Sequence, residues 1–298
     1  MGRAAPVDSG PVEPTFGVSV LPTASGRTDP VEEARHAEAV GFDLVTAWDH
    51  LHGERPSYET WTLLTWIAAR TSRIGLGTNV LGLPYRPPAV VAKMAESLDR
   101  LSGGRLVLGL GAGGSDREFA GFGVPVRAPR EKLEALEEAL EVIRGLWSER
   151  RFTYRGRHVR LREAELEPKP ARPIPIWLGV YGPRGADLVA RAADGWIPSM
   201  PYLPPERAAP RLAWIRERAE RAGRDPDAIT YAYNVPVRVG GQRSEDPARL
   251  VAGDPGEVVE RLGGLLAMGF TCLNLWLSGD RADQRERLAA EVLPHLRP

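Results

Sequence analysis

The stretch LDRLSGGRLVLGLGAGG, which runs from Leu98 to Gly114, contains the end of a helix, a break and a short buried strand. The helical pattern begins at the prolines of residues 87–88, and Ser102-Gly103-Gly104 ends it. The apolar run that follows is typical of a strand, and the glycines after it let the backbone approach a ligand closely. Helix, break, strand and glycine-rich end together form one unit of a parallel α/β sheet.

Outward from this stretch, short apolar runs alternate with longer helical patterns along the chain. The predicted strands cover residues 16–21, 43–48, 73–78, 105–110, 174–178, 195–198, 229–237 and 271–277. The predicted helices cover residues 31–40, 58–69, 87–101, 130–147, 184–193, 206–222, 257–268 and 282–296. Strict alternation of eight strands with eight helices favours an α/β fold of the closed (β/α)8 TIM-barrel kind over an open doubly wound sheet.

A small insertion, residues 148–173, interrupts the alternation before the fifth strand. Its segment from Phe152 to Val159 has the composition of a hairpin, and the insertion is either a solvated arginine-rich excursion or a lid over the site. Residues 1–15 are rich in proline, alanine and glycine and lack an apolar core, which indicates a disordered leader and not a signal peptide. We therefore expect a single barrel domain over residues 16–298.

The composition argues against several classes of partner. Thirty-nine basic residues balance thirty-nine acidic ones, so there is no electrostatic case for binding nucleic acid or an anionic membrane. No apolar run approaches the roughly 20 residues that span a bilayer. The single cysteine, Cys272, excludes an intrachain disulfide and indicates a reducing compartment. These features predict a cytoplasmic protein that acts on a small-molecule substrate.

Candidate chemistry is expected at the C-terminal ends of the strands, where barrel active sites lie. His50 follows the second strand and can exchange a proton near neutral pH, while the adjacent Asp49 can orient the ring. The alternative is that Asp49 caps a turn and His50 is merely packed. Asn79, after the third strand, suits either a bulge beside a planar ligand or a plain loop.

The glycines of residues 109–114 partly match the GxGxxG pattern of dinucleotide-binding folds. That interpretation is weak, because residues 116–119 are expected to lead into a loop and not directly into a helix. The five histidines show no HExxH-type or CxxC-type spacing, so no metal site is predicted. Cys272 lies inside an apolar strand and is expected in the core, whereas His52 is expected on a loop surface.

Leu98–Gly113 resembles the motif after the third helix of luciferase-like monooxygenases and of their relatives that use the deazaflavin coenzyme F420. Other segments agree with the family in order and spacing, and the resemblance extends over residues 16–200. These segments are 41–43 with 49–50, 73–78, 86–93, 118–119 with 123–125, 168–170, 175–179 and 193–196.

The resemblance implies a barrel that holds a flavin-type ring at its C-terminal mouth. Asp49 and His50 would lie beside the ring, and a non-proline cis peptide at Asn79-Val80 would support one of its faces. Backbone after the fourth and fifth strands would contact the ring and phosphate, at Ala112, Gly113, Gly114, Gly179, Val180, Tyr181 and Gly182. Peptide N–H groups near a helix start suit a phosphate.

Two departures from the family bear on the substrate. Gly114 stands where related deazaflavin sugar-phosphate dehydrogenases carry a catalytic glutamate, and the eighth strand has no basic residue. Both argue against a phosphorylated sugar. The first strand also lacks the histidine of some sulfonate monooxygenases. Aromatic residues predict an apolar pocket, although several must belong to the core: Trp48, Trp61, Trp66, Tyr85, Phe122, Tyr181, Trp196, Tyr202 and Trp276.

The leading hypothesis is an F420-dependent oxidoreductase that transfers a hydride, with His50 as proton donor and Asp49 as its orienter. Scarce lysine with abundant arginine, alanine and glycine indicates a GC-rich genome, which favours F420. Its acidic tail would need arginines at the rim, and the candidates, each equally a plain surface residue, are Arg86, Arg117, Arg184 and Arg127. The alternatives are a monooxygenase that uses reduced FMN and O2, and a non-catalytic cofactor-binding barrel or partner subunit. A homodimer is common in the family.

Overall fold

The computed structural model describes residues 13–26, 28–51, 56–242 and 244–297, and eight strands of this part of the chain close into a parallel barrel. Closure is complete because β12 pairs with β1 while β9 pairs with β10. In ring order the strands are β1 (Thr15–Ser19), β2 (Leu44–Ala47), β3 (Gly75–Thr78), β5 (Leu106–Gly111), β8 (Ile176–Leu178), β9 (Gly195–Trp196), β10 (Thr230–Val239) and β12 (Cys272–Leu277). The predicted TIM barrel is confirmed, and the open sheet is excluded.

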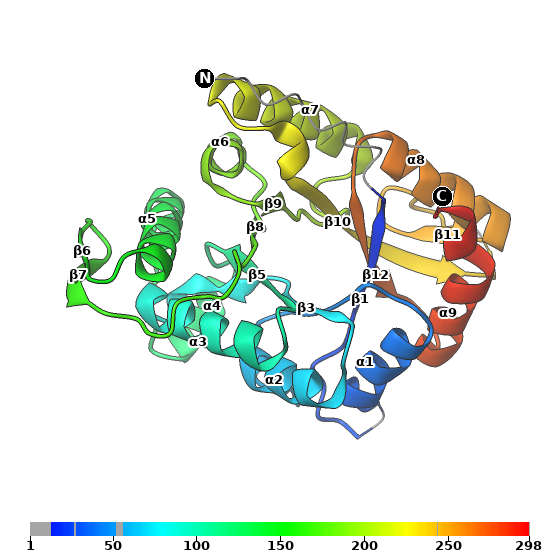
Figure 1. The fold of residues 1–298 in the computed structure, drawn as a ribbon. Coiled ribbons are helices and arrows are strands. Elements are labelled where there is room, and N and C mark those ends of the chain that lie inside the picture. The colour runs from blue at the N-terminus through cyan, green and yellow to red at the C-terminus, as the bar shows by residue number, and fades with distance from the viewer. Residues whose placement is uncertain (1–12, 27, 52–55, 243, 298) are drawn as a thin grey trace, which may run out of the picture.

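Helices form an outer ring around the strands (Figure 1). They are α1 (Pro30–Ala39), α2 (Thr60–Arg70), α3 (Pro88–Leu101), α5 (Pro129–Ser148), α6 (Pro183–Ala192), α7 (Pro205–Arg221), α8 (Pro255–Ala267) and α9 (Arg281–Arg287). Many begin with proline, whose missing N–H costs nothing in the first turn of a helix. Most of them turn an apolar stripe inward, as α5 does with Leu136, Leu140 and Ile143, whereas α9 buries Gln284 and Arg285.

The last predicted helix is divided in the structure. α9 continues into a π-helical turn, η3 (Leu288–Val292), and then a 3-10 turn, η4 (Leu293–His295). Pro294 has no N–H to donate to the preceding turn, so the regular helix cannot run through it. At the other end, Thr15 already belongs to β1 and pairs with Cys272. The predicted leader otherwise falls largely on residues 1–12, which lie outside the described residues.

The insertion before β8 forms the expected hairpin, with β6 (Phe152–Arg155) antiparallel to β7 (Arg160–Ala164). It lies against the outer side of α5, at the periphery of the molecule (Figure 1). A carboxylate of α5, Glu138, accepts three backbone N–H groups of the hairpin turn, at 2.7 to 2.9 Å. Phe152 packs directly over Gly145 of α5. The hairpin is therefore fastened to a helix, and the structure gives no support to a lid.

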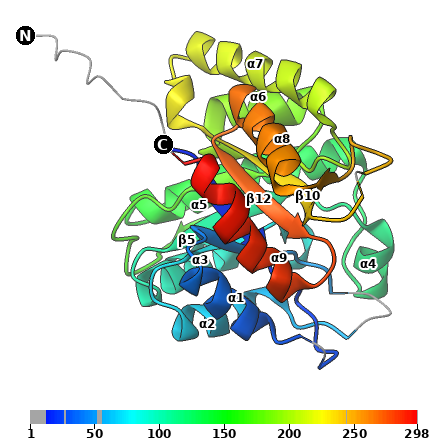
Figure 2. The ribbon, with the colours of Figure 1, turned by 90° about the vertical axis from the view of Figure 1, so that its right-hand side faces the viewer.

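Several short elements were not predicted. They are β4 (Leu81–Gly82), η1 (Leu83–Tyr85), α4 (Asp116–Gly121), η2 (Pro226–Ala228) and β11 (Val251–Gly253). The prediction of a loop at residues 116–119 was wrong, because α4 begins just after Ser115. This helix lies beyond the end toward which the β12 arrow points (Figure 2). Among the described helices, none combines the length and the apolar character that a membrane span requires.

Candidate functional site

A cavity of about 1150 Å3 opens at the C-terminal ends of the barrel strands. The segments after β2, β3, β5 and β8 form most of its wall, and Ile197, Asn234 and Trp276 complete it. All eleven residues that the resemblance singled out line this one cavity: Asp49, His50, Asn79, Val80, Ala112, Gly113, Gly114, Gly179, Val180, Tyr181 and Gly182. The barrel topology brings them together although they are spread over more than a hundred residues of sequence.

The Asn79-Val80 peptide bond is cis, as the resemblance implied. A network of amide side chains supports this bulge from the barrel interior. The Asn79 side chain donates to Oδ1 of Asn234 at 2.7 Å, and Asn234 donates back to Oδ1 of Asn79 at 3.1 Å. Asn274 on β12 and Ser199 also contact Asn234, so one β10 side chain connects the bulge to the barrel interior. Buried amides require such partners.

The glycines of the cavity wall serve two different purposes. A Cβ at Gly111 or Gly179 would come within 2.6 to 2.9 Å of Val80, so these glycines make room for the bulge. Gly113 has φ +95° and faces Phe119 and Pro84, so its conformation and its surroundings both require glycine. At Gly114 and Gly182 a Cβ would meet nothing within 4 Å. Gly114 and Gly182 are therefore the glycines that leave open space for a ligand.

His50 is held by a carboxylate that the sequence did not point to. Its Nδ1 lies 2.7 Å from Oε1 of Glu118 on α4, and the Tyr85 hydroxyl donates to Oε2 of the same carboxylate at 2.7 Å. Burial raises the pKa of Glu118, but hydrogen bonds from Tyr85 and His50 outweigh it and hold that pKa below its usual value. Glu118 is therefore ionised at neutral pH, and its charge raises the pKa of Tyr85 further than burial alone.

The expectation that Asp49 orients His50 was wrong. The Asp49 side chain is buried and forms a two-point ion pair with Arg86, at 2.7 and 3.1 Å. It also accepts the Gly82 N–H at 2.9 Å, and Arg86 continues to Glu59. Because a buried carboxylate needs a cation and donors of its own, Asp49 fastens the loops after β2 and β3 to each other. Because Arg86 is engaged in this pair, it is no longer a candidate for the rim arginines that would bind the acidic tail of the cofactor.

The model of the luciferase-like monooxygenase family matches residues 15–252. This chain belongs to that family. An F420-dependent glucose-6-phosphate dehydrogenase of Kineococcus radiotolerans is 30% identical, over 89% of this chain and 92% of that protein. An F420-dependent hydroxymycolic acid dehydrogenase of Mycobacterium tuberculosis is 36% identical, over 85% of this chain and 73% of that protein.

Solved structures agree on the fold of this luciferase-like protein. An F420-dependent secondary alcohol dehydrogenase in complex with an F420–acetone adduct superposes with a TM-score of 0.83 at 21% identity, over 96% of this chain and all of that chain. The F420-dependent tetrahydromethanopterin reductase of Methanopyrus kandleri gives 0.82 at 23% identity, with the same coverage. At these identities the likeness concerns the barrel fold.

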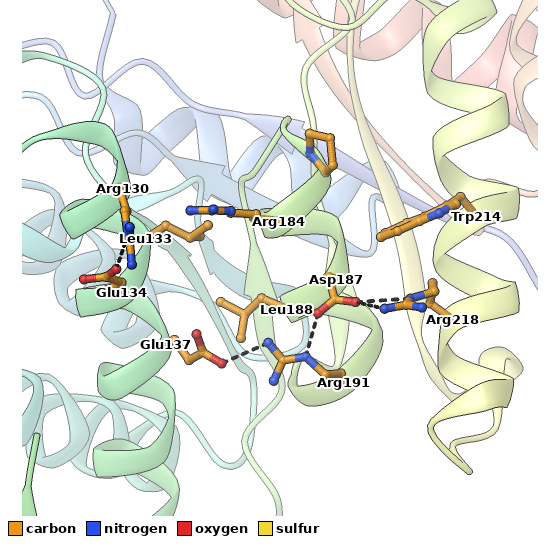
Figure 3. Close-up of a pocket in the computed structure, with 11 residues that line it drawn as sticks. Arg130, Leu133, Glu134, Glu137, Arg184, Asp187, Leu188, Arg191, Trp214 and Arg218 are labelled. Atoms are coloured by element: carbon orange, nitrogen blue, oxygen red, sulfur yellow. Dashed lines mark hydrogen bonds and ion pairs between the residues drawn. The ribbon is translucent and has the colours of Figure 1, made fainter.

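A smaller groove of about 470 Å3 adjoins the cavity of the luciferase-like barrel, between α5, α6 and α7 (Figure 3). The groove and the cavity share Arg130, Leu133, Pro183 and Arg184. Deeper in the groove the charges are paired, since Asp187 accepts from both Arg191 and Arg218 at 2.7 and 2.8 Å. At the junction Arg184 extends from α6 toward Arg130 on α5 (Figure 3). Two guanidinium groups thus converge where the cavity ends.

The four candidate rim arginines have different surroundings. Arg184 lines both the cavity and the groove, and among the described residues it has no ion-pair partner. Arg86 is paired internally, while Arg117 and Arg127 are not among the residues that line either space. Arg130 is a further cation at the rim, which was not predicted from the sequence. It stands on the first turn of α5, where it bonds Glu134 at 2.6 Å.

The aromatic residues divide as expected between the site and the core. Trp48, Tyr85, Tyr181, Tyr202 and Trp276 line the cavity, joined by Phe119. Trp61 and Trp196 are buried in the core, and Trp66 and Phe122 are exposed outside the cavity. Tyr181 and Tyr202 meet edge to face at 5.9 Å, which closes one side of the wall. His52 lies outside the described residues.

Proposed function

We propose that this luciferase-like protein is an F420-dependent oxidoreductase that transfers a hydride between the deazaflavin and a small organic substrate. The observation that carries the proposal is the convergence, in one cavity, of a histidine held by a carboxylate, a cis bulge and two glycines that leave open space. The relatives at 30 and 36% identity support F420 over FMN, because both are named as F420-dependent dehydrogenases.

The residues present fit such a cofactor. A volume of about 1150 Å3 exceeds the roughly 300–1,000 Å3 of ordinary ligand pockets, and so admits a tricyclic ring together with a chain and a substrate. We propose that Val80 supports one face of the ring and that Ala112 to Gly114 border it. Gly179, Val180, Tyr181 and Gly182 would hold the ring edge and the phosphate. When bound, F420 supplies or accepts the hydride.

The N-terminus of α6 is the proposed phosphate site. Gly182 precedes Pro183, the first residue of α6, and unpaired peptide N–H groups at a helix start favour an anion. Arg184 and Arg130 converge directly beside this point. We propose that they hold the acidic tail beyond the phosphate and direct it into the groove between α5 and α6. The neutral ribityl part of the cofactor would need no such cations.

His50 is the proposed proton carrier. In the direction of reduction it gives a proton to the substrate oxygen, and in the direction of oxidation it takes the hydroxyl proton. Asp49 contributes indirectly, because its ion pair with Arg86 holds the loop that carries His50.

The extent of the domain, the compartment, the oligomeric state and the partners belong to the same proposal. We propose that residues 16–298 act as a single barrel domain, in the cytoplasm, and as a homodimer. The proposed partner is a small-molecule substrate, without nucleic acid or membrane. The balance of charge and the single buried cysteine support this setting. Light scattering on the purified protein tests the dimer.

The deciding experiment is a titration of the purified protein with F420 and with FMN, each oxidised and reduced. Micromolar binding of F420, at least tenfold tighter than FMN, is expected. His50→Ala should leave this affinity within a few-fold but lower turnover by about 10²- to 10⁴-fold, the usual contribution of a general acid or base. A preference for reduced FMN would make the protein a monooxygenase. Binding of neither cofactor would leave a non-catalytic barrel.

A further inference from the structure

We propose that Glu118 is the positioning residue of His50 and determines which ring nitrogen faces the substrate. The inference rests on the proposed function for its catalytic meaning, but its structural part stands alone. Nδ1 of His50 lies 2.7 Å from Oε1 of Glu118, while His50 also lines the cavity. The carboxylate comes from α4, four residues beyond the open glycine at position 114.

The hydrogen bonds around Glu118 leave only one assignment for the ring proton. Oε2 accepts the Tyr85 hydroxyl at 2.7 Å, and the Leu51 N–H also donates to the carboxylate. These donors keep the pKa of Glu118 low in spite of its burial, so the group is a carboxylate that can only accept. The hydrogen between Glu118 and His50 must therefore sit on Nδ1. Nε2 is then the nitrogen that exchanges a proton with the substrate oxygen.

The surroundings hold the carboxylate in place. Phe119, the next residue of α4, packs edge to face against Tyr85 with ring centroids 5.0 Å apart. Lys132 of α5 bonds the Gly113 carbonyl at 3.3 Å and pairs with Asp116 at the start of α4. The short helix is thus tied to η1 on one side and to α5 on the other. Its Glu118 side chain is only 9% exposed.

The neighbouring carboxylate is not a competitor for this role. Asp49 precedes His50 in the chain, but both of its oxygens are engaged by Arg86 and one also by Gly82. Without Glu118, no other side-chain acceptor is bonded to Nδ1 among the described residues. An imidazole left in water carries its proton mainly on Nε2. Loss of Glu118 should therefore reverse the tautomer and leave a proton on Nε2, which can then no longer accept the hydroxyl proton of an alcohol substrate.

The test is ¹⁵N NMR of the histidine rings in the cofactor-free protein at pH 8.5, with the His50 signals identified by their loss in His50→Gln. The wild type should show the Nδ1–H tautomer of His50, and Glu118→Leu the Nε2–H tautomer. Tyr85→Phe, which keeps the carboxylate, should retain Nδ1–H. Glu217→Leu is the matched control and should retain Nδ1–H, because Glu217 is an exposed carboxylate of α7 that pairs with Arg221 and does not line the cavity.

A wild-type His50 that carries its proton on Nε2 overturns the proposal, and this measurement needs no variant to fold. Kinetics provide the second readout, with isopropanol as the probe substrate and F420 as the acceptor. Glu118→Leu should lower kcat by about 10- to 100-fold while the Kd for F420 changes less than threefold. An unchanged kcat in that variant also overturns the inference. If F420 does not bind the wild type, the proposed function fails while the NMR result still decides the role of Glu118.

Discussion

Gly114 shows how a single missing side chain shapes the cavity. Its backbone lies in the cavity wall, and a Cβ there would meet nothing within 4 Å. Gly114→Leu should therefore fold normally but place four carbons in the ligand space, which lowers F420 affinity at least tenfold. Fluorescence titration of F420 measures the affinity, and thermal unfolding checks the fold.

Gly264→Leu is the control for that variant. Gly264 lies on α8, where an added Cβ also meets open space, and it does not line the cavity. Its affinity for F420 should match the wild type. Equal affinity in both variants would mean that the ring does not approach Gly114. Gly113 is unsuitable for such a test, since its φ of +95° and its contact with Phe119 would disturb the fold.

Cys272 is the residue for which the structure predicts a pH dependence. Complete burial on β12 raises the pKa of its thiol to about 11. The unfolded chain loses this proton near pH 9, whereas the folded chain keeps it until about pH 11. This contribution to stability is therefore complete below pH 9 and is lost as the pH rises toward 11, by about 3 kcal/mol in all.

The measurement is the free energy of unfolding in urea at pH 8 and at pH 10.5, for the wild type and for Cys272→Ala. The difference between the two proteins removes the contribution of the tyrosines, which titrate in the same range. The wild type should lose more stability than the variant over this interval. Parallel losses would show that the folded thiol ionises as easily as the unfolded one.

At the scale of elements, β10 carries the side chain that supports the bulge after β3. Asn234→Ala would leave the half-buried amide of Asn79 and the buried amide of Asn274 without their shared partner. Each unsatisfied group costs about 1–3 kcal/mol, so the variant should be destabilised by at least that amount. F420 affinity should fall as well, because the bulge borders the cavity. Urea unfolding and cofactor titration measure the two effects.

A double-mutant cycle with Asn79→Ala tests whether the two side chains act as one unit. Two hydrogen bonds join the two side chains, one donated by each. The double variant should therefore lose clearly less stability than the sum of the single variants. Additive losses would mean that Asn234 acts through Ser199 and Asn274 alone.

At the scale of the whole molecule, the distribution of charged side chains around the cavity limits the charge of the substrate. Among the described residues that line the cavity, the permanent cations are Arg130 and Arg184, and both stand at the α6 end. The part beside His50 is lined by Trp48, Phe119 and other apolar groups, and its two carboxylates are already paired. An uncharged alcohol or ketone fits this environment, whereas a phosphate would find no permanent cation there.

We therefore expect uncharged secondary alcohols to reduce F420 at least a hundredfold faster than glucose 6-phosphate does. The assay follows F420 absorbance, with the Kineococcus radiotolerans relative as the positive control for the sugar phosphate. Efficient turnover of glucose 6-phosphate would show that Arg130 and Arg184 serve the substrate and not the cofactor tail.

The barrel could be predicted from the amino-acid sequence, because hydrophobic periodicity and glycine or proline breaks are local signals that recur once per βα unit. It also placed the site, since the ends of parallel strands must meet at one face of a barrel. The resemblance supplied the cis bulge at Asn79-Val80. The wall residues after the fourth and fifth strands, from Ala112 to Gly182, likewise came from the resemblance, whereas strand-end position alone marked Asp49, His50 and Asn79.

Which of these groups contact one another depends on the folded arrangement of the chain. Asp49 and His50 are neighbours in the chain, yet the backbone sends one side chain toward Arg86 and the other toward Glu118. Arg130, Glu118 and Asn234 come from three separate elements and have no local pattern that marks them. The pairing of charges depends on distance and burial in three dimensions, and those quantities exist only after the chain has closed around its core.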